Sequence, residues 1–153
     1  FLARWKPESR ALSWVSAGHL PGILIRDSGS LDSLKSTGLL IGLDANAEWE
    51  QLDTVLSPGD RILLFSDGVT ESANSKGDLF GLARLTSWFS LVNERPLIVA
   101  IMKINEVIAE WRCNSSPNDD LTLLALKCEL VPHLKNSEHQ ASTVYEEVQS
   151  VPQ

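Results

Sequence analysis

Two continuous apolar runs dominate this chain of 153 residues. Residues 61–66 read RILLFS, and residues 121–130 read LTLLALKCEL. Apolar runs of strand length without alternation are typical of strands that are buried on both faces. A strong turn signal, SPGD at residues 57–60, precedes the first run. We therefore expect both runs to be well-buried strands, the first of them central in its sheet.

Weaker patterns predict the remaining elements. Alternating residues on either side of a turn-forming Pro-Glu-Ser-Arg predict a hairpin over 1–17, and three further strands are expected at 22–26, 31–35 and 49–56. A helix is expected over 79–92 with Asp78 as its N-cap, and a second helix begins near Pro96. Spacings of four and three place one apolar set on a single face of the second helix: Leu97, Ile101, Ile104, Ile108 and Trp111. Many strands, two helices and a last strand predict an α+β fold.

Composition restricts the class of protein. Hydrophobic residues make up 43% and charged residues 22%, as in ordinary globular domains. The net charge of -7 argues against a general nucleic-acid binder. No run is long enough to span a bilayer, and no signal-peptide pattern opens the chain. From residue 132 the sequence is polar and aperiodic, so we expect a domain at 1–131 and a disordered polar tail at 132–153.

The cysteines and histidines form no recognisable metal motif. Cys113 and Cys128 are too far apart for a Cys-x-x-Cys site, and the three histidines are scattered. Free thiols in a reducing cytoplasm are the expected state, and a disulfide cannot be inferred from the sequence. We therefore expect a cytoplasmic protein without a zinc site.

Acidic residues adjoin both buried runs. Asp67-Gly68 follows the first run, and Asp119-Asp120 precedes the second. Carboxylates at strand ends suit a hard divalent cation, and Asp67 and Asp119 would converge if the two strands are neighbours in the sheet. The alternatives are an ordinary Asp-Gly turn and solvated loop charges. Each acidic spot alone favours its alternative, and the pairing with two buried strands raises the metal hypothesis without deciding between the two.

An ordered set of motifs raises the metal hypothesis further. The set comprises SAGHLP at 16–21, GLLIGL at 38–43, LSPGDRILLFSDGVTE at 56–71, FG at 80–81 and DDLTLLALK at 119–127. From about Phe1 to Leu130 the chain resembles the SpoIIE/RsbU branch of the PPM (protein phosphatase 2C-like) phosphatases. The pair PGDRILLFSDGVTE and DDLTLLALK is the most specific part of the resemblance.

The resemblance implies a PPM-type β-sandwich of two antiparallel sheets flanked by helices, with two manganese or magnesium ions held by aspartates at one edge. Asp67 matches the metal ligand of the family's SDG motif, and Asp119 matches the first acid of its DDLT motif. Asp120 would support the site or cap the turn, and Gly68 would let the chain turn tightly beside the metal. His19 is a possible proton donor, although a histidine in a tight Gly/Pro loop is more often structural.

One part of the family pattern is missing. These phosphatases also carry an upstream Gly-Asp-x-x-Asp motif, and before Asp27 the chain has no acid at a strand end except Glu8 in the hairpin turn. The chain also begins with Phe1 rather than Met. We therefore expect a fragment or a processed chain that lacks the N-terminal third to half of the domain.

The resemblance implies a metal-dependent serine/threonine protein phosphatase of bacterial signalling. Its expected substrates are phosphorylated anti-anti-sigma proteins with a STAS fold, in partner-switching control. Cys113 is followed by no arginine, which argues against a cysteine phosphatase. The alternative is a catalytically incomplete module for regulation or interaction, which the missing acids favour. A small-ligand-binding β-domain is a third hypothesis, but it leaves both acidic strand ends unexplained.

Overall fold

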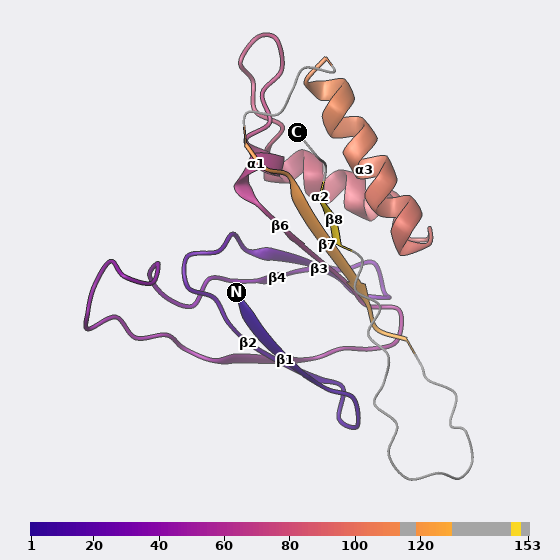
Figure 1. The fold of residues 1–153 in the computed structure, drawn as a ribbon. Coiled ribbons are helices and arrows are strands. Elements are labelled where there is room, and N and C mark those ends of the chain that lie inside the picture. The colour runs from indigo at the N-terminus through magenta and orange to yellow at the C-terminus, as the bar shows by residue number, and fades with distance from the viewer. Residues whose placement is uncertain (114–118, 130–147, 151–153) are drawn as a thin grey trace.

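The computed structural model describes residues 1–113, 119–129 and 148–150. Two antiparallel sheets are stacked, and helices cover the outer face of the larger sheet (Figure 1). The smaller sheet has the strand order β1-β2-β5, and the larger one has the order β4-β3-β6-β7-β8. The strands are β1 (Leu2–Lys6), β2 (Ala11–Val15), β3 (Gly22–Ile25), β4 (Leu31–Leu34), β5 (Leu52–Val55), β6 (Arg61–Phe65), β7 (Thr122–Lys127) and β8 (Val148–Ser150). The helices are α1 (Asp67–Thr70), α2 (Gly81–Leu91) and α3 (Leu97–Trp111). This arrangement confirms the predicted sandwich of antiparallel sheets flanked by helices.

The two apolar runs form strands, as predicted, and these strands are neighbours in the larger sheet. β6 lies between β3 and β7, and its antiparallel register with β7 pairs Arg61 with Lys127 at one end and Phe65 with Leu123 at the other. Burial explains the continuous apolar sequence of β6, because its side chains point alternately to the other sheet and to the helices. Each predicted strand is present, and the predicted hairpin is β1 paired with β2.

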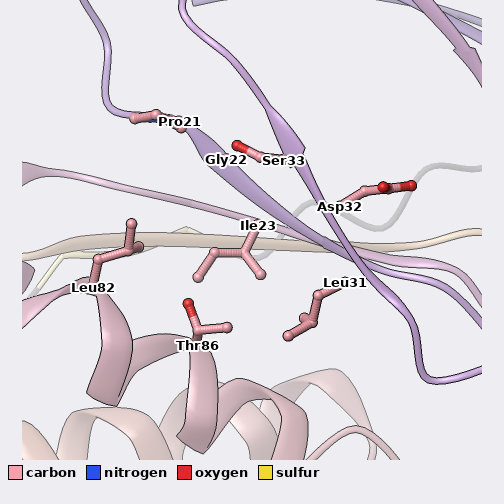
Figure 2. Close-up of a pocket in the computed structure, with 8 residues that line it drawn as sticks. All are labelled: Pro21, Gly22, Ile23, Leu31, Asp32, Ser33, Leu82 and Thr86. Atoms are coloured by element: carbon pink, nitrogen blue, oxygen red, sulfur yellow. The ribbon is translucent and has the colours of Figure 1, made fainter.

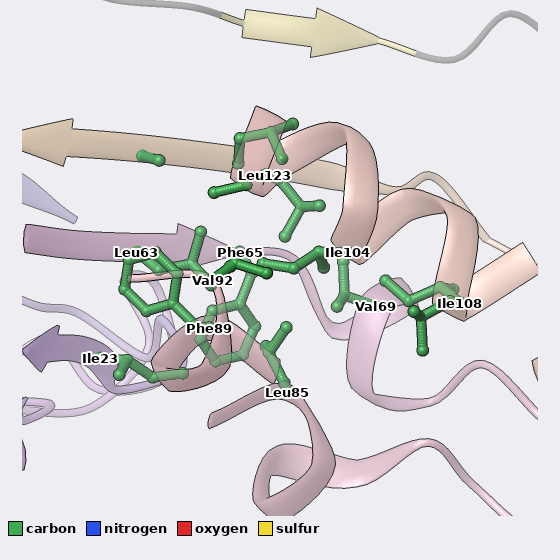
Figure 3. Close-up of a cluster of buried hydrophobic side chains, with 14 of the residues drawn as sticks. Ile23, Leu63, Phe65, Val69, Leu85, Phe89, Val92, Ile104, Ile108 and Leu123 are labelled. Atoms are coloured by element: carbon green, nitrogen blue, oxygen red, sulfur yellow. The ribbon is translucent and has the colours of Figure 1, made fainter. Parts of the chain in front are cut away.

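One hydrophobic core lies between the larger sheet and the helices (Figure 3). Ile104 and Ile108 of α3 are fully buried against Phe89 of α2 and Leu63 of β6 in this cluster. The predicted apolar face of α3 is therefore correct, with its two end residues, Leu97 and Trp111, only partly buried. Amphipathic spacing identified this face because a surface helix buries a single stripe.

A second core fills the space between the two sheets. Its buried members come from β2, β3, β4, β6 and the segments next to β5 and β7: Leu12, Trp14, Leu24, Leu34, Leu56, Ile62 and Cys128. Inward-facing residues of both sheets therefore meet, as in other sandwiches.

The start of α2 differs from the prediction. Phe80, not Asp78, occupies the N-cap position, and the helix begins at Gly81. The carboxylate of Asp78 instead accepts a hydrogen bond from Asn74 Nδ2 at 3.1 Å, and its N–H donates to Asn74 Oδ1 at 2.9 Å. Asp78 thus closes the loop at 74–78, and the buried Phe80 ring then anchors the chain before the helix begins.

Only part of the predicted tail lies in the described structure. Within 132–153, where we expect a disordered polar tail, the described residues are 148–150, which form β8 and pair with β7. The remainder of that expectation lies outside the described residues. The two cysteines are free thiols, as expected, with Cys113 exposed and Cys128 buried. Within the described ranges, no helix combines the length and the apolar character needed to cross a membrane.

Asp60 connects the turns at one end of the sandwich. Its side chain is 1% exposed and accepts hydrogen bonds from the backbone N–H of Asp27 and of Ser57, both at 2.9 Å, and from Arg26 Nη1 at 3.0 Å. The preceding Gly59 has a φ of +96°, and a Cβ there would lie 1.9 Å from Asp27 Oδ1. The PGD turn is therefore specified by a close approach and a buried carboxylate.

Candidate functional site

The pairing of β6 with β7 brings the two acidic segments side by side. In this pairing Phe65 of β6 lies opposite Leu123 of β7. Asp67 comes two residues after Phe65, and Asp119 and Asp120 come shortly before Leu123. The strands are antiparallel, so the end of one and the start of the other share one edge of the sheet (Figure 1). The condition stated from sequence, that the two strands be neighbours, is met.

Ser66 holds the two segments together. Its N–H donates to the Thr122 carbonyl at 3.1 Å, and its Oγ donates to the Asp120 carbonyl at 2.8 Å. The same Oγ accepts the N–H of Thr122 at 3.0 Å. Sequence reasoning assigned no role to Ser66, although a hydroxyl residue directly beside an acidic motif was a usable signal.

Gly68 permits the close approach. A Cβ at this position would lie 2.5 Å from the Asp120 carbonyl oxygen and 3.3 Å from that of Asp119. Gly68 is buried in α1 and is not among the glycines with positive φ. The structure thus gives a reason for glycine at this position, which is space against the backbone of the second acidic segment.

The carboxylates of Asp67 and Asp119 are exposed and sparsely bonded. Oδ1 of Asp67 accepts the N–H of Gly68 at 3.0 Å, and Oδ1 of Asp119 accepts the N–H of Asp120 at 2.8 Å. Within the described ranges, the second oxygen of each has no hydrogen-bond partner. Exposed carboxylate oxygens are the donors that Mg²⁺ and Mn²⁺ prefer, so the chemistry of this donor set fits such ions.

Within the part of the chain that the structure describes, the donor set is incomplete. Among residues 1–113, 119–129 and 148–150, no group of three or more His, Cys, Asp and Glu side chains is placed to hold a metal ion. Asp120 is exposed, and its described hydrogen bonds are made by its backbone: the carbonyl accepts from Ser66 Oγ, and the N–H donates to Asp119 Oδ1. A site here therefore needs waters, phosphoryl oxygens or other protein ligands to complete its coordination.

His19 lies beside the same edge. Its Nδ1 is 2.7 Å from the Leu20 carbonyl oxygen, which can only accept, so Nδ1 carries the proton and Nε2 is the ring atom left for another partner. A cavity of about 250 Å³ joins His19 to the region of Ser66. Its lining residues are Phe1, His19, Leu64, Phe65, Ser66, Thr122 and Leu124.

A second, smaller cavity lies elsewhere. It has a volume of about 100 Å³ and lies between α2 and the β3–β4 hairpin (Figure 2). Leu82 and Thr86 of α2 lie on one side of it and Ile23 and Leu31 on the other, and Asp32 and Ser33 also belong to its lining. None of the predicted site residues lines it. The stronger candidate for the functional site is therefore the sheet edge where Asp67 follows β6 and Asp119 and Asp120 precede β7, here named the acidic edge, together with the His19 cavity.

Comparison with known proteins identifies the family of the chain. The profile of the family "Stage II sporulation protein E (SpoIIE)" matches residues 1–129. The chain is 35% identical over 80 residues to the phosphoserine phosphatase RsbU of Bacillus subtilis, an alignment that covers 52% of this chain and 24% of that protein. It is 32% identical over 119 residues to Protein IcfG of Synechocystis, covering 75% of this chain and 18% of that protein. The chain thus spans a quarter or less of these relatives.

Solved structures share the fold. The SiaA-PP2C domain of Pseudomonas aeruginosa superposes with a TM-score of 0.70 at 22% identity, over 79% of this chain and 48% of that one. The phosphatase domain of SpoIIE from Bacillus subtilis, presoaked with Mn, gives a TM-score of 0.61 at 15% identity, over 91% of this chain and 58% of that one. At these identities the likeness concerns the fold. Together with the family match over most of its length, it shows that the chain belongs to the Stage II sporulation protein E (SpoIIE) family of phosphatase-domain proteins.

Proposed function

We propose that the chain is the C-terminal part of a metal-dependent serine/threonine protein phosphatase domain that acts in bacterial signalling in the cytoplasm. The observation that carries this proposal is the apposition of the Asp67 and Asp119 segments through Ser66 and Gly68. Membership of the family supports it, as does the phosphoserine phosphatase activity in the name of the relative RsbU. The proposed substrate is a phosphorylated regulatory protein of the anti-anti-sigma (STAS) type in a partner-switching system.

The proposed cofactors are two Mn²⁺ or Mg²⁺ ions in the complete domain. The Mn presoak of the related SpoIIE phosphatase domain is consistent with this choice. Such ions supply Lewis acidity toward phosphoryl oxygens. The carboxylates of Asp67 and Asp119 would bind the ions, and Gly68 and Ser66 would fix the spacing between the two carboxylates. Asp120 would support this arrangement through its backbone carbonyl.

His19 has a defined place in this proposal. The hydrogen bond from Nδ1–H to the Leu20 carbonyl orients the ring. With a second proton on Nε2, the imidazolium would donate that proton to the leaving oxygen of the substrate and return to the neutral ring. The Phe1 ring packs beside the imidazole at a centroid distance of 5.6 Å and limits its rotation. The structural alternative, in which His19 only holds its loop, rests on the same hydrogen bond.

The direct test measures phosphate release from p-nitrophenyl phosphate with Mn²⁺ present. It uses the protein together with any sequence that precedes Phe1 in its gene. Asp67→Asn and Asp119→Asn should each lower kcat/KM at least about 100-fold, because each removes a charged ligand. Asp32→Asn is the matched control, since its side chain is 53% exposed on β4 and lies outside the site. Full activity in both site variants would refute the ligand assignment.

A second candidate function is a non-catalytic interaction module. It is favoured by the absence of a third metal-binding side chain near the two acids in the described part of the chain. An in-frame Gly-Asp-x-x-Asp motif in the gene upstream of Phe1 would support the enzyme. A genuine start codon at this point without that motif would support the module.

A further inference from the structure

The loop from Gly38 to Trp49, here named the apolar loop, exposes a contiguous set of large apolar side chains. Leu39 and Leu40 are each 54% exposed, Leu43 is 69% exposed and Ile41 is 74% exposed. Single exposed leucines are common on protein surfaces, but four within five positions are not. Figure 1 shows this loop projecting from the body of the sandwich. Such a set is typical of a protein interaction surface.

Hydrogen bonds hold the apolar loop in one shape. At its base the indole Nε1 of Trp49 donates to the Leu39 carbonyl at 2.7 Å. Gly38 packs so closely on the same indole that a Cβ would lie 2.5 Å from its Cδ1. Near its tip, the N–H of Leu43 donates to the Leu40 carbonyl at 3.3 Å. A surface that is ordered before binding loses less conformational entropy when a partner binds.

The apolar loop adjoins the candidate active site. A Cβ on Gly18 would lie 3.0 to 3.1 Å from atoms of Leu40, so Leu40 packs directly on the backbone of Gly18. The next residue, His19, lines the cavity that reaches Ser66 and Thr122. A protein that presents a side chain to the acidic edge would therefore also meet the apolar loop.

The charges around the apolar loop indicate the chemistry of its partner. Asp44 and Glu48 are exposed on its second half, the exposed Glu50 directly follows it, and residues 36–60 contain no lysine or arginine. An acidic rim repels the anionic surface of a membrane and attracts basic side chains. The complementary surface is apolar and carries lysine or arginine.

We propose that the apolar loop binds the substrate protein that carries the phosphorylated serine or threonine. The surface of that protein next to the phosphorylated residue would be apolar and surrounded by basic residues. This inference rests on the proposed phosphatase function and adds a determinant of substrate choice outside the acidic edge. Ile41 and Leu43 supply the contact area because they are the most exposed of the four. Asp44 and Glu48 supply the charge.

The binding test uses two phosphoserine peptides of equal length. One has leucines and lysines around the phosphoserine, and the other has serines and glutamates there. Fluorescence anisotropy with residues 1–153 should show at least about tenfold tighter binding of the leucine–lysine peptide. The double variant Ile41→Ser/Leu43→Ser should lose this preference. Leu91→Ser, a matched change of a leucine 71% exposed at the end of α2, should keep it.

Three binding results would overturn the docking inference. They are no measurable binding of either peptide, an unchanged preference in the double variant, and an equal loss in Leu91→Ser. Binding of the wild-type chain to phosphatidylglycerol vesicles that depends on Ile41 and Leu43 would assign the loop to a membrane instead.

An activity test separates this inference from the proposed function. Because p-nitrophenyl phosphate is too small to reach the apolar loop, the double variant should hydrolyse it at the wild-type rate, while kcat/KM for the leucine–lysine peptide falls at least about tenfold. Hydrolysis without any peptide preference refutes the docking role and leaves the phosphatase intact. Peptide preference without hydrolysis refutes the phosphatase and leaves a binding module.

Discussion

Replacing Gly68 by alanine tests whether the spacing of the two acidic segments matters. The added Cβ would lie 2.5 Å from the Asp120 carbonyl oxygen, whereas ordinary contact begins near 3.4 Å, so the segments must separate by about 0.9 Å. If that shift falls on the 2.8 Å bond between Ser66 Oγ and the Asp120 carbonyl, its length becomes about 3.7 Å. This distance is too long for a hydrogen bond, so the connection between the segments is lost.

Two measurements report the effect. Isothermal titration calorimetry should show that Gly68→Ala binds Mn²⁺ about 10- to 100-fold more weakly, which is the usual effect of disturbing residues that orient metal ligands. Urea denaturation should show that the free energy of unfolding falls by about 1–3 kcal/mol, which is the usual cost of forcing an extra methyl group into a packed site. The second value does not depend on metal binding.

Gly22→Ala is the matched control. Its Cβ would lie 2.6 Å from Leu64 Cδ2, the end of a flexible side chain that can move aside, and not from backbone. We expect a small loss of stability and unchanged Mn²⁺ affinity. Equal Mn²⁺ affinity in wild type and Gly68→Ala would refute the argument that Gly68 fixes the spacing of the carboxylates. A larger affinity loss in Gly22→Ala would refute it as well.

Two further predictions concern the end of the sandwich opposite the acidic edge. Asp60→Ala leaves two backbone N–H groups without their acceptor, and in urea denaturation it should lower the free energy of unfolding by about 3–5 kcal/mol. Asp32→Ala breaks an exposed ion pair with Arg26, which also bonds to Asp60, and should lower that free energy by less than about 1 kcal/mol. Similar losses would contradict the structural role of Asp60. Burial, and to a smaller extent the nearby charge of Asp60, raises the pKa of the Cys128 thiol. Because only the thiolate reacts, iodoacetamide at pH 8 should modify Cys128 at least about tenfold more slowly than the exposed Cys113. Peptide mass spectrometry checks this, and equal rates would count against the burial of Cys128.

Sequence patterns predicted most of the secondary structure for identifiable reasons. β6 was found because a strand that is buried on both faces needs continuous apolar residues. The run of β7 was interpreted in the same way, but only its Leu123 and Ala125 face is buried, and Leu124 and Leu126 on the other face are half-buried. The buried face of α3 was found because its spacing matches the helical period. The start of α2 was predicted wrongly because a capping preference is worth about 1 kcal/mol, less than the burial of the Phe80 ring beside it.

The candidate site was only partly predictable. The acids could be named from their places at strand ends, and their neighbourhood followed once β6 and β7 were assumed to pair. The bonds of Ser66 and the contact of Gly68 with Asp120 could not be predicted, because they depend on a register that residues far apart in sequence determine together. Asp60 was recognised as a turn residue, but its burial requires knowledge of which other turns pack against it.

The network around Asp60 also affects how mutational scans of this domain should be interpreted. β6 is only five residues long, so a shift of its first residue is transmitted along a short, stiff strand to the acids beyond its far end. A substitution at Asp60 would then reduce activity in a screen as much as a substitution of a metal ligand does. The side chain of Asp60, however, bonds only to structural turns at Asp27 and Ser57 and to Arg26 in the described residues. Ranking positions by lost activity alone would misassign this carboxylate to the chemistry, and a parallel measurement of folded protein would correct the assignment.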